Sequence, residues 1–204
     1  MQPFTILAAP ACPLGLANVD TDQLIPARFM KRPRSAGYGG VLLHDLRFDE
    51  AGLCRANFVL DAPRFSGAGI LVARSNFGTG SSREAAVYAL WDYGIRCVVA
   101  SGFGDIFASN AVKNGLLPAT VTPADAEALL AHLQRAGDVA VTIDLERQEI
   151  LAGGLRLVFA VDPVRRLQLL NGWDDIDLTT RHAHAIADYR SVWTQTAPWA
   201  WPLP

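Results

Sequence analysis

The chain has 204 residues, half of them hydrophobic, and a formal net charge of −2 at neutral pH. This length gives one domain of ordinary size with enough interior for a core. The apolar fraction excludes a disordered chain, and the near-zero charge argues against nucleic acid as a partner. No apolar run reaches the length of a membrane-spanning helix, and the N-terminus lacks the basic start of a signal peptide. We therefore expect a cytoplasmic protein without a membrane partner.

Three cysteines, Cys12, Cys54 and Cys97, are widely separated in the sequence. An odd, scattered set does not make a disulfide framework, and without a CxxC pair it does not make a metal site. We expect free thiols that are buried or partly buried. His182 and His184 are two residues apart, so on a helix they point to different faces, and no metal site is expected there.

Residues 1–66 carry many Pro, Gly and Arg residues and few clean periods, so an irregular N-terminal segment is predicted. Within it, residues 18–40 are expected to form a long loop that borders a substrate or an interface. Long loops in compact domains are usually binding elements or disordered.

Residues 69–121 alternate between strand and helix patterns. The apolar run at 69–74 is typical of a buried parallel strand. A helix is predicted over 82–93, with Gly94 at its end. The same alternation continues with a strand over 95–100, a helix over 105–113 and a strand over 116–121. This βαβαβ order indicates an α/β fold with right-handed parallel crossovers.

The last third begins with a predicted surface helix over 122–137, with Thr122 as N-cap and Gly137 as C-terminal cap. Residues 139–145 and 155–161 resemble antiparallel strands flanking a turn at Gly153 and Gly154. Two more helices are predicted, one from residues 162–163 to 171–172 and one over 180–193. The tail at 194–204 is expected to be non-helical, with tryptophans that are exposed unless they dock.

A polar, glycine-rich stretch, NFGTGSSREAA at residues 76–86, lies between the first strand and helix of the βαβαβ region. Ligands bind at such turns of open α/β sheets, and helix N-termini favour anions. A Walker loop would need Lys directly after Gly80, where Ser81 stands, and a dinucleotide fingerprint would need Gly at position 83, where Arg stands. A nucleophile elbow would need Gly two residues after Ser81, at the same position 83. The residue types therefore argue against all three kinds of site.

A simpler alternative stays open, in which Ser81 or Ser82 caps the helix and Glu84 occupies its first turn. Capping does not explain why Asn76, two glycines, two serines and Arg83 occur together. Glycines allow a ligand to approach the backbone closely, and arginine presents a planar fork to a carboxylate.

The stretch resembles the motif N-F/Y-G-x-G-S-S-R-E-H-A of the 3-isopropylmalate dehydratase small subunits and the aconitase swivel domain. Three more segments are similar to that family, namely NVDTDQLIPARF, DYGIRCVVASGFGDIFASNAVKNGLLP and FAVDPVRRLQLLNGWDDIDLTTRHAHAIADY. The resemblance covers nearly the whole chain. It implies a single swivelling β/β/α domain over 1–204, with a parallel βαβαβ layer and a second, partly antiparallel sheet.

The resemblance also implies a function. The chain would be the small subunit of a heteromeric hydro-lyase that isomerises 2-isopropylmalate and 3-isopropylmalate through 2-isopropylmaleate, in leucine biosynthesis. Its partner would be a large subunit that carries a [4Fe-4S] cluster on three cysteines. This chain itself would bind no cofactor and no metal.

By the family motif, Ser81 is the base that removes a proton next to a carboxylate. A serine can act so only as an alkoxide, stabilised by hydrogen-bond donors and positive charge. Arg83 would supply that charge and hold a substrate carboxylate, with Ser82 as a hydrogen-bonding neighbour. Asn76 and Gly80 would shape the substrate-binding turn.

A basic cluster at residues 28–34 contributes two further candidates for substrate contact, Arg28 and Arg32, with a solvated surface as the alternative. Asp20 and Asp22 are expected to organise this loop by capping or ion pairing rather than to act on substrate.

Two positions depart from the family motif. Thr79 stands where the family has Cys, and Ala85 stands where it has His. This histidine would lie beside the reactive serine in the sequence, so its loss changes the set of residues that surround and orient that serine. Two alternatives therefore stay open: a paralogous hydro-lyase acting on another substituted malate, of the methylmalate or homoaconitate type, and a non-catalytic carboxylate-binding module.

Overall fold

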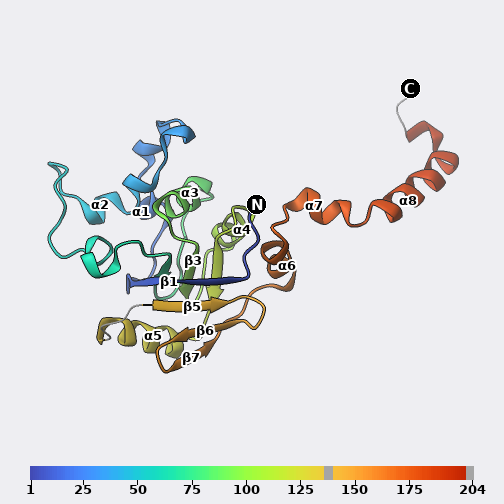
Figure 1. Ribbon diagram of the computed structural model, residues 1–204. Helices are drawn as coiled ribbons and strands as arrows, with labels where there is room; N and C mark the ends of the chain where they lie inside the picture. Colours follow the sequence, from blue (N-terminus) through green and yellow to red (C-terminus); the bar gives the residue numbers. More distant parts are fainter. Residues whose placement is uncertain (136–139, 201–204) are drawn as a thin grey trace.

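The structure, a computed structural model, describes residues 1–135 and 140–200 (Figure 1). Its centre is a seven-stranded sheet in the order β4-β3-β2-β1-β5-β6-β7. The first four strands in this order are parallel to one another, and the pairs from β1 to β7 are antiparallel. The predicted α/β fold, with a parallel layer and an antiparallel part, is confirmed. The strands are β1 Ile6–Pro13, β2 Ile70–Val72, β3 Cys97–Ala100, β4 Leu117–Thr120, β5 Ala140–Asp144, β6 Glu149–Ala152 and β7 Leu155–Val158.

Strand β1 joins the two halves of the sheet. Residues 6–10 pair antiparallel with β5, and residues 11–13 pair in parallel with β2. The prediction that residues 1–66 are irregular is therefore wrong for β1. Its sequence, ILAAPACP, contains two prolines, which normally argue against a central strand. Here Pro10 lies where the strand changes partner, and Pro13 ends it.

The two edges of the sheet meet. The Thr120 amide donates to the Ala160 carbonyl at 3.1 Å, and the Ala160 amide donates to the Thr120 carbonyl at 2.7 Å. This bridge joins the end of β4 to the residues just after β7, so the sheet curls back on itself. Unpaired edge strands are prone to associate with other chains, and this contact covers part of both edges.

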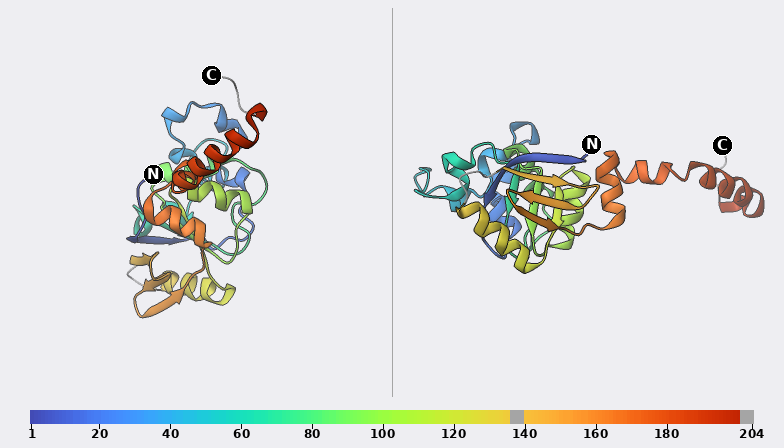
Figure 2. Two further views of the ribbon diagram at one scale, coloured as in Figure 1. Left: turned by 90° about the vertical axis from the view of Figure 1, so that its right-hand side faces the viewer. Right: turned by 60° about the horizontal axis from the view of Figure 1, so that its bottom comes forward.

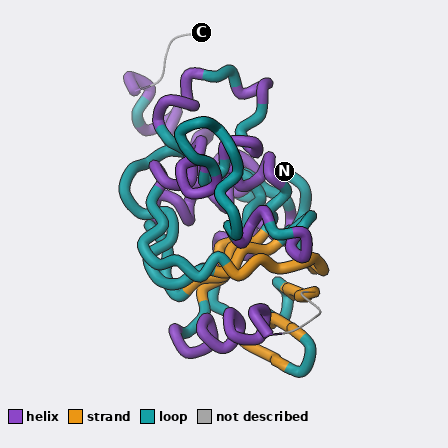
Figure 3. The backbone as a smooth tube through the Cα atoms, turned by 90° about the vertical axis from the view of Figure 1, so that its left-hand side faces the viewer, coloured by secondary structure: helices purple, strands orange, loops and turns teal. Residues whose placement is uncertain are grey.

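Helices cover both faces of the sheet. Helices α3 (Glu84–Tyr93) and α4 (Asp105–Lys113) lie on one side, and α5 (Pro123–Arg135) lies on the other, as Figures 1 and 3 show. Helix α3 starts two residues later than predicted, and Gly94 ends it in the left-handed conformation, as expected. The predicted cap of α5 at Gly137 lies outside the described residues. Leu129, Leu130 and Leu133 form its buried stripe.

The antiparallel half contains one more strand than predicted. Strand β6, residues 149–152, lies between the two strands that were expected to form a hairpin, and it pairs with both β5 and β7. The turn at Gly153 and Gly154 connects β6 to β7, so the turn was located correctly but one of its strands was not.

The N-terminal segment contributes to the core although it is mostly irregular. It contains the short helices α1 (Thr21–Leu24) and α2 (His44–Arg47) and several 3₁₀ turns. Arg47 is 8% exposed, and its guanidinium donates to both oxygens of Asp61 and to the Leu42 carbonyl. The segment, including α1, packs against α3. Its buried side chains join the core, among them Leu24, Ile25, Leu42, Leu43 and Leu60.

The C-terminus leaves the body as an arm. Helix α6 (Pro163–Asn171) is capped by Asp162 and ended by Gly172, as predicted. Helices α7 (Asp175–Thr180) and α8 (Ala183–Thr196) then project away from the sheet (Figures 1 and 2). The predicted helix over 180–193 is present as α8, which begins and ends three residues later, and α7 is an additional helix that was not predicted. The expectation of a non-helical tail from residue 194 is wrong, since α8 reaches Thr196 and Pro198–Ala200 form a 3₁₀ turn.

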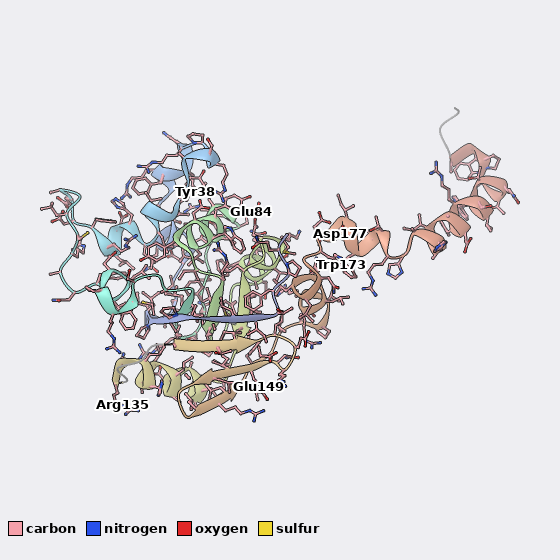
Figure 4. The ribbon with its side chains drawn as sticks, viewed as in Figure 1. Tyr38, Glu84, Arg135, Glu149, Trp173 and Asp177 are labelled. Carbon is pink, nitrogen blue, oxygen red and sulfur yellow. The ribbon has the colours of Figure 1, made fainter. Side chains whose placement is uncertain are left out.

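The two helices of the arm, α7 and α8, contain no buried residue. Trp173 and Asp177 mark the place where it leaves the body (Figure 4). No residue of α8 is buried, and Trp199 is 85% exposed. Among the described residues, no helix combines the length and apolar character that crossing a bilayer requires.

Candidate functional site

The glycine-rich loop at residues 75–83 lies between two other backbone segments. On one side residues 18–21 run parallel to it, through hydrogen bonds of 2.7–2.9 Å that join Asn18 to Ser75, Gly78 to Val19, and Thr21 to Thr79. On the other side Phe77 bonds both Gly102 and Gly104 at 2.9–3.0 Å. The two family-like segments NVDTD and NFGTGSS thus form one unit, although about 60 residues of sequence separate them.

Two loop residues allow this close fit through their backbone conformation. Gly78 has φ +74°, and a Cβ there would lie 2.2 Å from the ring of Phe107. Asn76 has φ +60°, and its side-chain amide donates to Asn18 Oδ1 at 2.9 Å. Asparagine tolerates the left-handed region better than most residues. In the structure Asn76 therefore shapes the turn.

Ser81 is exposed, and its hydroxyl lies 3.0 Å from the hydroxyl of Thr21. The Ser81 amide also donates to Thr21 Oγ1, at 3.2 Å. The idea that Ser81 or Ser82 caps the helix is wrong, since the N-cap of α3 is Arg83, without a side-chain cap. The backbone stays extended through Arg83, and the Ser81 hydroxyl interacts with Thr21 instead of a helix amide.

Arg83 forms an ion pair with Asp22. Asp20 caps α1 in a capping box with Gln23, whose amide donates to Asp20 Oδ1 at 2.7 Å. The expectation that the two aspartates organise the loop by capping and ion pairing is confirmed. Three consecutive residues, Asp20, Thr21 and Asp22, thus position the loop that carries Ser81 and Arg83.

A pocket of about 240 Å³ opens beside Ser81. The loop residues 78–81, including Gly80, form one wall, and residues 104–107 at the start of α4 form the other. First-turn amides of a helix lack intrahelical partners and carry partial positive charge, so this wall favours an anion. Asp105 contributes a carboxylate to the same pocket. Ser82 is exposed next to Ser81.

Arg28 and Arg32 line two other pockets. Arg28 lies in a pocket of about 490 Å³ and pairs with Asp45. The hydrogen bond from Arg28, helped by His44, lowers the pKa of Asp45 to about 2. Arg32 stacks over Phe29, 5.0 Å from the ring centroid, and lines a pocket of about 480 Å³. Of the predicted site residues, Gly80 and Ser81 line the pocket beside α4, and Asn76 and Arg83 belong to the same loop without lining that pocket. Arg28 and Arg32 line neither wall of it.

The described part of the chain contains no group of three or more His, Cys, Asp or Glu side chains that could hold a metal ion. Cys12 and Cys97 are buried on β1 and β3, which β2 separates. Cys54 is on the surface, so the expectation of burial is wrong for this thiol. Three cysteines in these places do not fit an iron–sulfur cluster, which needs thiolates gathered around one point.

Comparison with known proteins agrees with this geometry. A profile of the aconitase C-terminal domain matches residues 1–124. A 3-isopropylmalate dehydratase small subunit from Rhodospirillum centenum is 46% identical over 201 residues, covering 98% of this chain and 99% of the relative. The chain belongs to the family of 3-isopropylmalate dehydratase small subunits. A second small subunit, from Agrobacterium fabrum, is 44% identical over 98% of this chain and 100% of its own length.

A solved structure in the same family shares the fold. It is described as 3-isopropylmalate dehydratase (leuD) from Methanocaldococcus jannaschii, and it matches with a TM-score of 0.64 at 26% identity. The match covers 90% of this chain and 99% of that one. The family membership expected from the motifs is confirmed.

Two residues that contact the motif were not predicted from the sequence. Thr21 touches Ser81, and Asn114 at the end of α4 donates to Glu84 Oε1 at 2.8 Å, at the first turn of α3 (Figure 4). The DTD segment contains Thr21, but its residue types predict roles only for the two flanking carboxylates. Of the two departures from the small-subunit motif, Thr79 lines the pocket, and Ala85 packs half-buried against the core.

Proposed function

We propose that the chain is the small subunit of a heteromeric hydro-lyase that interconverts 2-isopropylmalate and 3-isopropylmalate through 2-isopropylmaleate. The reaction belongs to leucine biosynthesis, which we place in the cytoplasm, and residues 1–204 act as a single swivel domain. One observation carries the proposal: the similarity to small subunits of this dehydratase extends over 98% of the chain.

In this proposal Ser81 removes the proton next to a substrate carboxylate. Its hydroxyl lies at a pocket whose other wall is the start of α4, where amides and the helix dipole favour negative charge. Arg83 binds a carboxylate of the substrate, and its ion pair with Asp22 holds the guanidinium beside the loop. Gly80 and Asn76 give the loop its shape, and Ser82 is a neighbouring hydrogen-bond donor.

The proposal includes a partner. The relatives are named small subunits, so we place a large subunit against the open side of this pocket and a [4Fe-4S] cluster within that subunit. The positions of the cysteines support this, since Cys12 and Cys97 lie on strands that β2 separates and Cys54 is on the surface. Arg28 and Arg32 contact the substrate only if the partner completes a common site, since alone they line separate pockets.

Ala85 favours a second candidate for the substrate, because the motif histidine is missing there. A different substituted malate, of the methylmalate or homoaconitate type, would then be preferred. The base and the arginine would keep their roles, and only the group beside the reacting carbons would differ.

The test is co-expression with the large subunit and assay of a panel of substituted malates. Activity should need both chains, and Ser81→Ala should lower kcat by about 10²–10⁴-fold. Ser191→Ala, on the exposed helix α8, is the control and should leave kcat unchanged. Full activity of this chain alone, or of the Ser81→Ala complex, would refute the proposal. Binding of malates without turnover would support a carboxylate-binding module instead.

A further inference from the structure

The hydroxyls of Thr21 and Ser81 lie 3.0 Å apart, and either oxygen could donate to the other. Their surroundings differ. Thr21 is 1% exposed, whereas Ser81 is exposed at the pocket. A buried hydroxyl that does not donate its proton is costly, while an exposed one can donate to water.

The donors and acceptors around the two hydroxyls determine the direction of this bond. Thr21 Oγ1 already accepts from the Ser81 amide at 3.2 Å. If Ser81 also donated its hydroxyl proton, Thr21 would accept twice, and its own buried proton would have no other acceptor in the described part of the chain. If Thr21 donates to Ser81 Oγ, every group of the pair is satisfied.

We propose that Thr21 is a positioning residue for Ser81, which donates its hydroxyl proton to Ser81 Oγ and thereby stabilises the deprotonated oxygen. The inference rests on the proposed role of Ser81 as a base. When Ser81 loses its proton to solvent, the bond from Thr21 is kept and becomes charge-assisted, which strengthens it. The same bond fixes the direction in which the Ser81 oxygen points.

Charged groups also surround the pair. Arg83 is paired with Asp22, Asp20 caps α1, Glu84 begins α3, and Asp105 lies across the pocket on α4. A substitution at Thr21 leaves all of these charges in place. A shift in ionisation at position 81 on removal of the Thr21 hydroxyl therefore reports the loss of its hydrogen bonds to Ser81 and not a change of nearby charge.

The backbone hydrogen bonds of Thr21 itself do not involve its hydroxyl, which accepts one backbone bond, that of the Ser81 amide. The Thr21 amide donates to the Thr79 carbonyl at 2.9 Å, and the Thr21 carbonyl accepts from the Ile25 amide at 3.0 Å. Valine keeps the β-branched shape and these backbone bonds but lacks the hydroxyl. Serine keeps the hydroxyl and lacks the methyl group. The pair of variants Thr21→Val and Thr21→Ser thus separates hydrogen bonding from packing.

The first experiment measures kcat and KM of the reconstituted complex over pH. Thr21→Val should lower kcat by about 10–100-fold with KM little changed, and should raise the pKa of the ascending limb of the profile, where Ser81 loses its proton, by about one unit. Thr21→Ser should restore both. Thr142→Val, the same change on β5, should behave as the parent. A parental profile for Thr21→Val, or equal defects in Thr21→Val and Thr21→Ser, would overturn the proposal.

The second experiment does not need activity. In a full-length Cys54→Ser background, the thiol introduced by Ser81→Cys takes the place of the serine hydroxyl, while Cys12 and Cys97 are buried. Its pKa is measured from the pH dependence of alkylation. Adding Thr21→Val should raise this pKa by about one unit, and adding Thr21→Ser should not. An unchanged pKa would refute the donor role of Thr21 even if the proposed reaction holds.

The two experiments distinguish the possible failures. An active complex that loses activity with Ser81→Ala but not with Thr21→Val contradicts only the role of Thr21. Retained activity in the Ser81→Ala complex contradicts the proposed function, and the alkylation result then still decides whether Thr21 donates.

Discussion

Arg83 and Asp22 form an ion pair across 61 residues of sequence, beside the exposed hydroxyl of Ser81. The Asp22 side chain is 59% exposed and that of Arg83 22%. Solvent thus reaches the pair, and such pairs add at most about 1 kcal/mol to stability. The main effect of this ion pair is that it fixes the orientation of the Arg83 guanidinium.

Asp22→Asn should therefore raise KM for the malate substrate about tenfold, because a freely rotating Arg83 binds a carboxylate less well. The free energy of unfolding should change by less than about 1 kcal/mol. Steady-state kinetics of the complex and urea denaturation of the chain measure the two quantities. Glu127→Gln, which breaks the exposed ion pair with Arg74, is the control and should leave KM unchanged. An unaltered KM for Asp22→Asn would show that Arg83 is oriented by other contacts.

Gly78→Ala should lower the free energy of unfolding by about 2–4 kcal/mol, because it combines left-handed backbone strain with a clash against Phe107. Gly52→Ala shares the positive φ, at +77°, but meets no atom within 4 Å, so it should cost about 1–2 kcal/mol. Gly154→Ala has neither problem and should change stability by less than about 0.5 kcal/mol. Denaturant titrations give all three values, and equal effects of Gly78→Ala and Gly52→Ala would contradict the clash.

Asp45 should titrate with a pKa of about 2 in the folded chain, as measured by NMR, because Arg28 donates to its carboxylate. Arg28→Gln should return this pKa to about 4. Since the folded value lies below the unfolded one, the pair stabilises the fold above the unfolded pKa and loses this effect as pH falls toward 2. The pair is exposed, so the effect on stability is small. A pKa near 4 in the parent chain would mean that Arg28 is free to bind another anion.

One thiol of the native chain should react with Ellman's reagent at pH 8, and three should react after denaturation. Cys54 is exposed, whereas Cys12 and Cys97 are buried. Burial raises the pKa of the Cys12 thiol to about 12, with a smaller contribution from Asp61, and burial also raises the pKa of Cys97. Cys54→Ser should abolish the native reaction. A second reactive thiol would indicate that β1 or β3 opens.

The parallel half of the fold could be predicted because its strands are continuous apolar runs. Residues 97–100, for example, are all buried, and helices with clear ends separate them from their neighbours. Strand β1 could not be predicted, because prolines interrupt it and its two partners begin at residues 70 and 140. The motif located Ser81 and Arg83. Their contacts with Thr21 and Asp22 depend on a parallel alignment of distant segments, which no local pattern contains.

The central place of β1 also has a consequence for synthesis of the chain. Strand β1 leaves the ribosome without a partner until residues 70–72 emerge, and its antiparallel partner follows only with residues 140–144. The chain must therefore be made as far as residue 144 before the middle of the sheet can close. Such non-local pairing slows folding and leaves strand edges open to wrong contacts. During translation, Ile6–Pro13 should thus need to be kept from contacts with other chains until residue 144 has been made.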